Sequence, residues 1–448
     1  MASALVLAAA AGGWYLHSSV FGGLASSHAL AGLNSQPHAG ADLNILLMGL
    51  DSRRDNQGND LPPAVLAQLH AGSSSDVGGY NTNTLILLHV PADGSRAVAL
   101  SIPRDDFVDL PEGLGQHKIK EAYGRAKANA QAVAQADGTS DRATLERLGR
   151  EAGRHAAIDA VQRLLGVTVD HFAEVNLAGF YDLADALGGV PVCLREPVND
   201  RYSGAHFPAG VQTLDGAQSL AFVRQRHGLA NGDLDRTHRQ QAFLASAVNK
   251  LKRAGVFGDM SRIGALLDVA RRDVVVDSGF DLLSFIHRAG AVTSGDVTFY
   301  TLPITGYATE DGESVNLIDP AQVRAVAQRL LSGQGPDASG TAAPPPPGGP
   351  AIPQAAAETA AGVAAGGPAA PATASATEAP AATAAASATP SASALHDPVR
   401  RGKAVPKNAV RADTASPASV SAIAAPATTA PTTAAPVVTA PPGIPCVN

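Results

Sequence analysis

The C-terminal part of the chain limits where a folded core can form. Residues 334–448 contain no Phe, Tyr or Trp and consist mostly of Ala, Pro, Thr, Gly and Ser. Such a segment buries too little apolar surface to offset the conformational entropy that it would lose on folding. We therefore predict a disordered tail over residues 334–448 and place the fold in the preceding part, which is long enough for one large domain.

The N-terminus is apolar over residues 1–24, which contain no Lys or Arg. A membrane-spanning helix needs about 20 mostly apolar residues, so the length suffices, although an anchor or a signal peptide usually has a basic flank. A buried helix of the domain is the alternative, but Gly12, Gly13, Gly22 and Gly23 disfavour it. We predict a membrane anchor over residues 1–24, with the rest of the chain outside the cell, and a linker over residues 25–41.

Short apolar runs alternate with amphipathic segments over residues 42–333, which we predict to form the domain. The composition of buried strands is found at residues 44–50, 84–90, 97–102, 171–175, 190–194 and 297–302. Helical periodicity is found at residues 119–132, 142–165, 178–187, 214–222, 235–251, 261–270, 280–289 and 320–331. This alternation predicts a layered α/β/α sandwich with a mixed central sheet.

Charge, cysteine content and motifs exclude several functional classes. The formal net charge is −7, and the acidic and basic residues of the tail balance, so the domain is acidic and unsuited to nucleic acid. Two cysteines, Cys193 and Cys446, are too few for a zinc finger, an iron–sulfur site or a disulfide framework; outside the cell they could pair, although a strand cysteine is more often simply buried. The chain also lacks a Walker A motif, G-x-G-x-x-G after a strand, G-x-S-x-G and H-E-x-x-H.

Arginine stands beside acidic or amide residues at four ends of predicted elements. These clusters are residues 51–53 (DSR), 103–106 (PRDD), 224–227 (RQRH) and 233–236 (DLDR). If residues 223–227 are extended, Arg224 and Arg226 point to the same side, while Arg236 and Gln240 lie one turn apart on the next helix.

Guanidinium groups that converge beside a helix N-terminus suit a multiply charged phosphate. A nearby carboxylate such as Asp51 would repel that phosphate unless a hard cation such as Mg²⁺ lay between them. The clusters therefore predict a metal–diphosphate site, and ordinary surface ion pairs are the alternative. We interpret His89, His117 and His227 as structural or ordinary polar residues.

These clusters and the blocks around them resemble the LytR-CpsA-Psr family of cell-wall glycopolymer transferases, in particular its actinobacterial branch. The resemblance runs from about residue 44 to residue 251 and includes NILLMGLDSR, ALSIPRDDFVDLP, FPAGVQTLDGAQSLAFVRQRHG and DLDRTHRQQAFL. It implies a type II membrane protein with an extracytoplasmic α/β sandwich. It also implies that a glycan such as arabinogalactan is transferred, together with its phosphate, from a polyprenyl-diphosphate carrier to peptidoglycan. The implied cofactor is Mg²⁺ or Mn²⁺.

The resemblance also implies roles for individual residues. Asp51 would hold the metal, and Asp233 would support the arginines or polarise the incoming hydroxyl; either carboxylate is a candidate general base. The diphosphate would be bound by Arg104, Arg224, Arg226, Arg236 and Gln240, with Arg53 and Lys120 as further candidates. A lipid pocket would use apolar side chains that equally suit an ordinary core, namely Ile86, Leu88, Phe172, Val175, Phe180, Leu183, Leu187, Phe222 and Phe243.

One motif departs from the family pattern. Many members have Arg-Ser-Asp-Thr before the second strand, whereas residues 81–84 here read NTNT. Asn83 would offer the metal a neutral oxygen in place of a carboxylate, which lowers the expected metal affinity. Two other functions therefore stay open: a Mg²⁺-dependent diphosphatase that uses the same site, and a wall protein that binds the lipid carrier without turnover.

Overall fold

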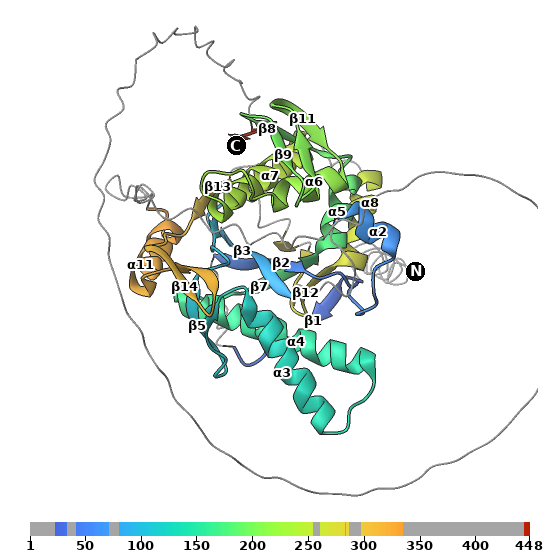
Figure 1. Ribbon diagram of the computed structural model, residues 1–448, viewed down its shortest axis with the longest axis vertical. Helices are drawn as coiled ribbons and strands as arrows, with labels where there is room; N and C mark the ends of the chain where they lie inside the picture. The colour runs from blue at the N-terminus through green and yellow to red at the C-terminus, as the bar shows by residue number, and fades with distance from the viewer. Residues whose placement is uncertain are drawn as a thin grey trace, which may run out of the picture. The chain divides into compact units, whose positions relative to one another are not determined.

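A mixed sheet forms the centre of the domain (Figure 1). The computed structural model describes residues 23–33, 42–70, 80–253, 260–282, 284–285, 297–334 and 443–448. Within these residues the central sheet has the strand order β1-β12-β7-β2-β3-β4-β13. The strands are β1 (Ala25–Ser27), β12 (Val274–Asp277), β7 (His171–Asn176), β2 (Leu43–Asp51), β3 (Asn81–Val90), β4 (Ala97–Ser101) and β13 (Val297–Thr301). Parallel and antiparallel neighbours alternate irregularly, which confirms the predicted mixed sheet.

Three helices cover one face of the sheet: α3 (Glu121–Ala136), α4 (Arg142–Leu165) and α11 (Pro320–Leu331). Leu46 and Leu87 of the sheet pack with Ile158 of α4 and Val323 of α11 in one buried cluster. The sequence sets the limits of α4, because the Asp141 side chain accepts a hydrogen bond from the Thr144 amide and Gly166 adopts φ +67° at the other end.

The other face carries the remaining long helices (Figure 1). These are α5 (Leu177–Ala186), α6 (Gly216–Arg224), α7 (Asp233–Arg253) and α8 (Met260–Asp273). Ile86 and Leu88 of β3 cluster with Leu244 of α7 on this face. The described residues thus form the α/β/α sandwich that the alternating pattern predicts.

Several short strands and one short helix escaped the sequence pattern because they have no continuous apolar run. They are the helix α2 (Pro63–Gln68) and the hairpins β5 (Phe107–Leu110) with β6 (Gly115–Lys118), β9 (Val198–Asp200) with β10 (Ala205–Phe207), and β14 (Gly306–Glu310) with β15 (Glu313–Leu317). A separate sheet has the order β11-β8-β16 and consists of β11 (Gly210–Leu214), β8 (Val190–Leu194) and β16 (Cys446–Val447).

The predicted linker over residues 25–41 is wrong at its start. Ala25–Ser27 form β1, which pairs in parallel with β12 at the edge of the central sheet. The Ser27 hydroxyl donates to Glu151 of α4 over 2.8 Å, so side chains also fix this strand. The predicted anchor lies outside the described residues except for Gly23 and Leu24, and among the helices described none is long and apolar enough to cross a membrane.

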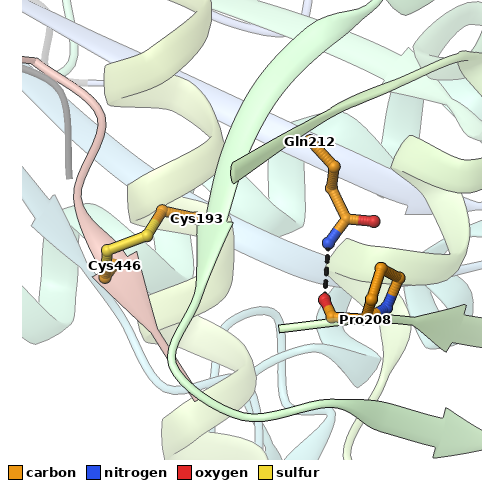
Figure 2. The surroundings of a disulfide bond; sticks show 4 residues. All are labelled: Cys193, Pro208, Gln212 and Cys446. Atoms are coloured by element: carbon orange, nitrogen blue, oxygen red, sulfur yellow. Dashed lines mark hydrogen bonds between the residues drawn. A yellow bond between two sulfur atoms is a disulfide. The ribbon is translucent and has the colours of Figure 1, made fainter. Parts of the chain in front are cut away.

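The predicted disordered tail is wrong at its C-terminal end. Cys446 is disulfide-bonded to Cys193 of β8 (Figure 2), and β16 pairs in parallel with β8. The Arg195 amide donates to the Val447 carbonyl over 2.8 Å, and Arg239 Nε donates to the Asn448 backbone oxygen over 2.7 Å. The disulfide bond and the pairing of β16 with β8 offset the conformational entropy that this end loses on folding. The amino-acid composition of the segment gave no indication of either interaction. Residues 335–442 of the predicted tail lie outside the described residues.

Two boundaries near the predicted site also differ from expectation. Helix α6 continues to Arg224, so the predicted extended conformation of residues 223–227 is wrong for its first two residues. Extended backbone begins at Gln225, with φ −58° and ψ 136°. Helix α7 begins at Asp233, which puts that carboxylate in the first helical turn. Half of the predicted helix over residues 280–289 lies outside the described residues, and the described residues 282, 284 and 285 are helical.

Candidate functional site

Strand ends and the start of α7 bring five predicted site residues together. Asn83 Nδ2 donates to Asp51 Oδ2 over 2.9 Å, and Arg104 Nη1 donates to Asn83 Oδ1 over 2.7 Å. Arg104 Nη2 lies 2.9 Å from Asp233 Oδ1, and Arg236 Nη2 lies 3.0 Å from Asp233 Oδ2. We call this continuous chain of contacts from Asp51 to Arg236 the arginine–carboxylate cluster.

A β-bulge places Asn83 in this cluster. Thr84 lies opposite Gly49 and Thr82 lies opposite Leu50, so Asn83 is the extra residue of β3 where the register shifts. A bulged residue is released from the strict alternation of side chains and can turn toward a functional site. This shift allows Asn83 to bridge Asp51 and Arg104.

The arginines of the cluster are buried, and nearby carboxylates balance their positive charge only in part. Arg104 is 7% exposed and Arg236 is 5% exposed. Burial, with a further contribution from the charge of Arg104, lowers the pKa of Arg236 to about 9 although Asp233 opposes the shift. Arg236 Nε is buried and has no hydrogen-bond acceptor among the described residues. A bound anion would supply the missing negative charge.

Arg53 and Arg224 lie close to Asp51. Arg53 Nη1 is 3.6 Å from Asp51 Oδ1. Arg224 donates through Nη1 to the Leu69 carbonyl over 2.9 Å, and burial lowers its pKa, with Asp51 opposing and Arg53 and Arg226 adding to the shift. Arg226 is exposed, two residues beyond Arg224. Despite the different backbone, both arginines remain within electrostatic reach of the cluster.

Two predicted diphosphate ligands have other partners. Lys120 Nζ lies 2.7 Å from Asp105 Oδ1, and Arg104 Nε lies 3.5 Å from Asp105 Oδ2. Against the desolvation of burial, Arg104 and Lys120 hold the pKa of Asp105 below its usual range. Gln240 Nε2 donates to the Val223 carbonyl over 3.3 Å and so fixes the end of α6. Asp105 belongs to the PRDD motif, but no sequence pattern indicated that it is the counter-ion of both Arg104 and Lys120.

The cluster offers a metal ion few protein ligands. Asp51 Oδ1 is buried without a hydrogen bond, but Asn83 Oδ1 already accepts from Arg104. Among the described residues, no group of three or more His, Cys, Asp or Glu side chains could hold a metal. The residues therefore fit a hard cation only in combination with oxygens from an anionic ligand.

The nine predicted lipid-pocket residues do not lie together. Ile86 and Leu88 are on the α7 face of the sheet, whereas Phe172 is buried on the opposite face in the cluster with α4. A third cluster, which joins α5 and α6 to β8 and β11, contains Phe180, Leu187, Phe222 and Phe243. Val175 approaches α5, since a side chain at Gly179 would meet it, and Leu183 is half-buried on α5.

The fold and the cluster define an α/β sandwich protein with buried arginines and carboxylates in contact at its strand ends. The model of the LytR_cpsA_psr family matches residues 24–331, and the chain belongs to this family.

Similar curated proteins include two from Corynebacterium glutamicum. "Cell wall biosynthesis protein LcpA" is 46% identical over 64% of this chain and 55% of its own length, and "Probable cell wall biosynthesis protein LcpB" is 30% identical over 64% and 60%. The "Polyisoprenyl-teichoic acid--peptidoglycan teichoic acid transferase TagU" of Oceanobacillus iheyensis is 28% identical over 61% of this chain and 69% of its own length. The matches thus span little more than half of the two C. glutamicum proteins.

Proposed function

We propose that the protein transfers a glycan with its phosphate from a polyprenyl-diphosphate carrier to a hydroxyl of peptidoglycan. The carrying observation is the buried Arg236, whose Nε has no hydrogen-bond acceptor among the described residues, beside Arg104, Asp51 and Asp233. A multiply charged anion would give the buried cations of this site the strongest electrostatic stabilisation. Family membership and the names of the three relatives support a role in cell-wall glycopolymer transfer.

The chemistry requires positioning and charge stabilisation. An acceptor hydroxyl, by analogy the 6-hydroxyl of muramic acid, attacks the phosphorus that carries the sugar. A new P–O bond forms, the bond to the bridging oxygen breaks, and polyprenyl phosphate leaves, while a base takes the hydroxyl proton. Arg104, Arg224, Arg226 and Arg236 would stabilise the charge on the phosphates, and Asp233 would position Arg104 and Arg236.

A divalent cation completes the proposal. Mg²⁺ or Mn²⁺ would be held by Asp51, with Asn83 beside it, and would neutralise charge on the phosphate oxygens. Both oxygens of Asp233 contact arginines, so Oδ1 of Asp51 is the carboxylate oxygen that we assign to the cation.

We further propose that residues 1–24 anchor the chain in the cell membrane as a type II protein, with the domain outside.

Ile86 and Leu88 would contact the polyprenyl chain of the carrier, because they lie on the α7 face of β3, the strand that also carries Asn83. No nucleic acid is expected as a partner, because the domain is acidic.

Product analysis distinguishes the proposed function from its alternatives. The full-length protein would be incubated with a polyprenyl-diphosphate glycan, peptidoglycan and Mg²⁺. Transfer gives a phosphodiester between glycan and peptidoglycan, a diphosphatase gives free glycan phosphate, and a non-catalytic binder gives neither product. We expect the phosphodiester, and exclusive formation of free glycan phosphate would refute the transfer reaction.

Replacing Arg226 with Ala should lower transfer without changing the melting temperature. Arg226 is exposed, and no ion pair with it is found among the described residues, so its loss removes a diphosphate contact of about 1.5 to 3 kcal/mol and little else. Arg224→Ala should lower both transfer and melting temperature, because Arg224 also holds the Leu69 carbonyl. Thermal melting and initial rates measure both. Normal activity of Arg226→Ala would remove that residue from the site.

Replacing Asn83 with Asp should strengthen Mg²⁺ binding to the substrate-free protein. The new carboxylate would lie beside Asp51 and could not donate to it as the Asn83 amide does, so a cation between them becomes favourable. In the wild type we expect weak Mg²⁺ binding until a polyprenyl diphosphate is present. Calorimetric titration of both forms, with and without ligand, measures this. Equal affinities would show that residue 83 does not approach the metal.

A further inference from the structure

A charged cavity lies beside the arginine–carboxylate cluster and has no role in the reaction described above. It has a volume of about 310 Å³ and is lined by the residues after β2 and by side chains of α3 and α4. Its described lining includes four cations, which are Arg53, Arg54, Lys127 and Arg142, and one carboxylate, Glu146. Gln131 and Gln135 add amide groups. The volume suits a ligand the size of one sugar or a short peptide.

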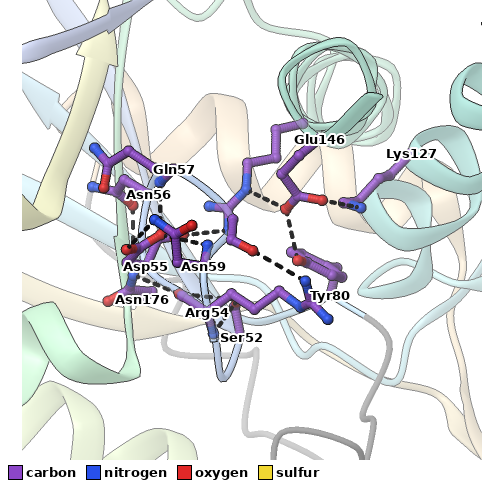
Figure 3. Close-up of polar contacts among 12 residues, drawn as sticks. Ser52, Arg54, Asp55, Asn56, Gln57, Asn59, Tyr80, Lys127, Glu146 and Asn176 are labelled. Carbon is purple, nitrogen blue, oxygen red and sulfur yellow. Dashed lines mark hydrogen bonds and ion pairs between the residues drawn. The ribbon is translucent and has the colours of Figure 1, made fainter. Parts of the chain in front are cut away.

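Buried hydrogen bonds hold the walls of this cavity in place. Figure 3 shows Glu146 with Tyr80 and Lys127. Glu146 accepts from the Tyr80 hydroxyl over 2.6 Å and from Arg150 Nε over 2.8 Å, and Lys127 Nζ lies 2.8 Å from its other oxygen. Arg150 Nη2 also donates to the Asp55 carbonyl over 2.7 Å, which fastens the loop after β2 to α4. A cavity with fixed charged groups is preorganised for a ligand.

The charge of the cavity suits a single carboxylate. Asp60 lies 3.2 Å from Arg54 and 3.7 Å from Arg142, Asp51 lies 3.6 Å from Arg53, and Glu146 contacts Lys127. Among the described residues these four cations contact three carboxylates, which leaves a small positive excess. A doubly charged phosphate would find better compensation at Arg104 and Arg236. Burial lowers the pKa of Lys127 even though Glu146 opposes the shift, so an added anion would be favourable there.

Arg53 connects the cavity with the cluster. This side chain lines the cavity and also lies 3.6 Å from Asp51 Oδ1. The cavity is lined by side chains of α3 and α4, which cover one face of the sheet, whereas Arg236 and Asp233 belong to α7 on the other face. In phosphoryl transfer the attacking and leaving oxygens lie roughly in line, so acceptor and carrier approach from opposite directions.

We propose that this cavity binds a carboxylate of the peptidoglycan acceptor, with Arg142 and Lys127 as the cations that recognise it. The inference rests on the proposed function. The muramoyl residue that offers the hydroxyl carries a peptide substituent with free carboxylates, and the glutamines of α3 would hydrogen-bond its amide groups. The cavity would thereby orient the acceptor hydroxyl toward the carrier's phosphate at the arginine–carboxylate cluster.

Binding of a small acceptor fragment tests this inference without any turnover. N-acetylmuramoyl dipeptide and the same compound with its carboxylates amidated would be titrated into the full-length protein by calorimetry. We expect the acid to bind about tenfold more tightly than the amide and Arg142→Gln to remove that difference.

Arg163→Gln is the matched control, because Arg163 is an exposed arginine of the same helix whose Nη2 lies 2.9 Å from Asp159, outside the cavity. It should leave binding unchanged. Equal binding of acid and amide, equal effects of the two variants, or equally effective displacement by inorganic phosphate would each overturn the assignment.

Transfer kinetics separate this inference from the proposed function. Arg142→Gln should raise KM for peptidoglycan about tenfold and leave KM for the lipid carrier unchanged. Transfer with an unchanged KM for peptidoglycan, or with a raised KM for the carrier, would overturn the acceptor site while the proposed function stands. Absence of transfer by the wild type would refute the proposed function, and the binding comparison would still decide what the cavity recognises.

Discussion

Replacing Asp233 with Asn should lower both the stability and the transfer rate of the protein. Asp233 lies 2.9 Å from Arg104 Nη2 and 3.0 Å from Arg236 Nη2, and both arginines are buried. Without the carboxylate, two buried guanidinium groups lose the anion that both of them contact, which costs about 3 kcal/mol. Because the arginines would no longer be held in position, we also expect transfer to fall about a hundredfold. Thermal melting and initial rates measure the two effects.

Ligand rescue and a neighbouring residue serve as controls for this prediction. A short-chain polyprenyl diphosphate should raise the melting temperature of Asp233→Asn more than that of the wild type, because its phosphates replace the lost negative charge. Asp235→Asn makes the same charge change on the same helical turn, but Asp235 accepts from the Asn231 amide over 2.9 Å, away from the arginines. If both variants melted and reacted alike, Asp233 would not be the counter-ion of the site.

Loss of the Cys193–Cys446 disulfide should destabilise the domain. The bond closes a loop with a sequence separation of 253 residues and holds β16 against β8. A crosslink across a long loop contributes on the order of 4 kcal/mol, chiefly by restricting the unfolded chain. Cys446→Ser is the cleaner variant, because the fully buried Cys193 then remains as a thiol that the core tolerates. We expect a clearly lower melting temperature for Cys446→Ser under oxidising conditions.

Reduction provides the internal control for the disulfide. Dithiothreitol should lower the melting temperature of the wild type to that of Cys446→Ser and leave the variant unchanged. Deletion of residues 334–448 should destabilise the protein to at least the same extent, because it removes both Cys446 and β16. A wild type insensitive to reductant would show that the bond makes no contribution.

Local sequence patterns predicted the core elements of the fold well. The observed α4, α11 and β8 coincide with their predicted ranges, because each combines a buried apolar pattern with clear end signals such as Asp141 and Gly166. Pairing between distant segments was not predictable in this way. The disulfide that fastens β16, and β1 at the sheet edge, depend on partners far away in the sequence.

For the candidate site, the sequence indicated the residue types but not their contacts. Arg104, Asp233 and Arg236 converge as the clusters at element ends predicted. The position of Asn83 depends on a register shift between β2 and β3, which only the paired strands reveal. Lipid-pocket residues could not be separated from core residues by sequence, because both are apolar. Phe172 was predicted to line the pocket for that reason, although it belongs to the core on the opposite face of the sheet.

The location of the carrier's diphosphate is the central claim, and a crystal structure of the full-length protein with a short-chain polyprenyl diphosphate tests it most directly. We expect both phosphates within hydrogen-bond distance of Arg104 and Arg236, with Arg236 Nε among the donors and the cation beside Asp51. Diphosphate density elsewhere, with the contacts of Asp233 to both arginines unchanged and no phosphate near Asp51, would contradict the account.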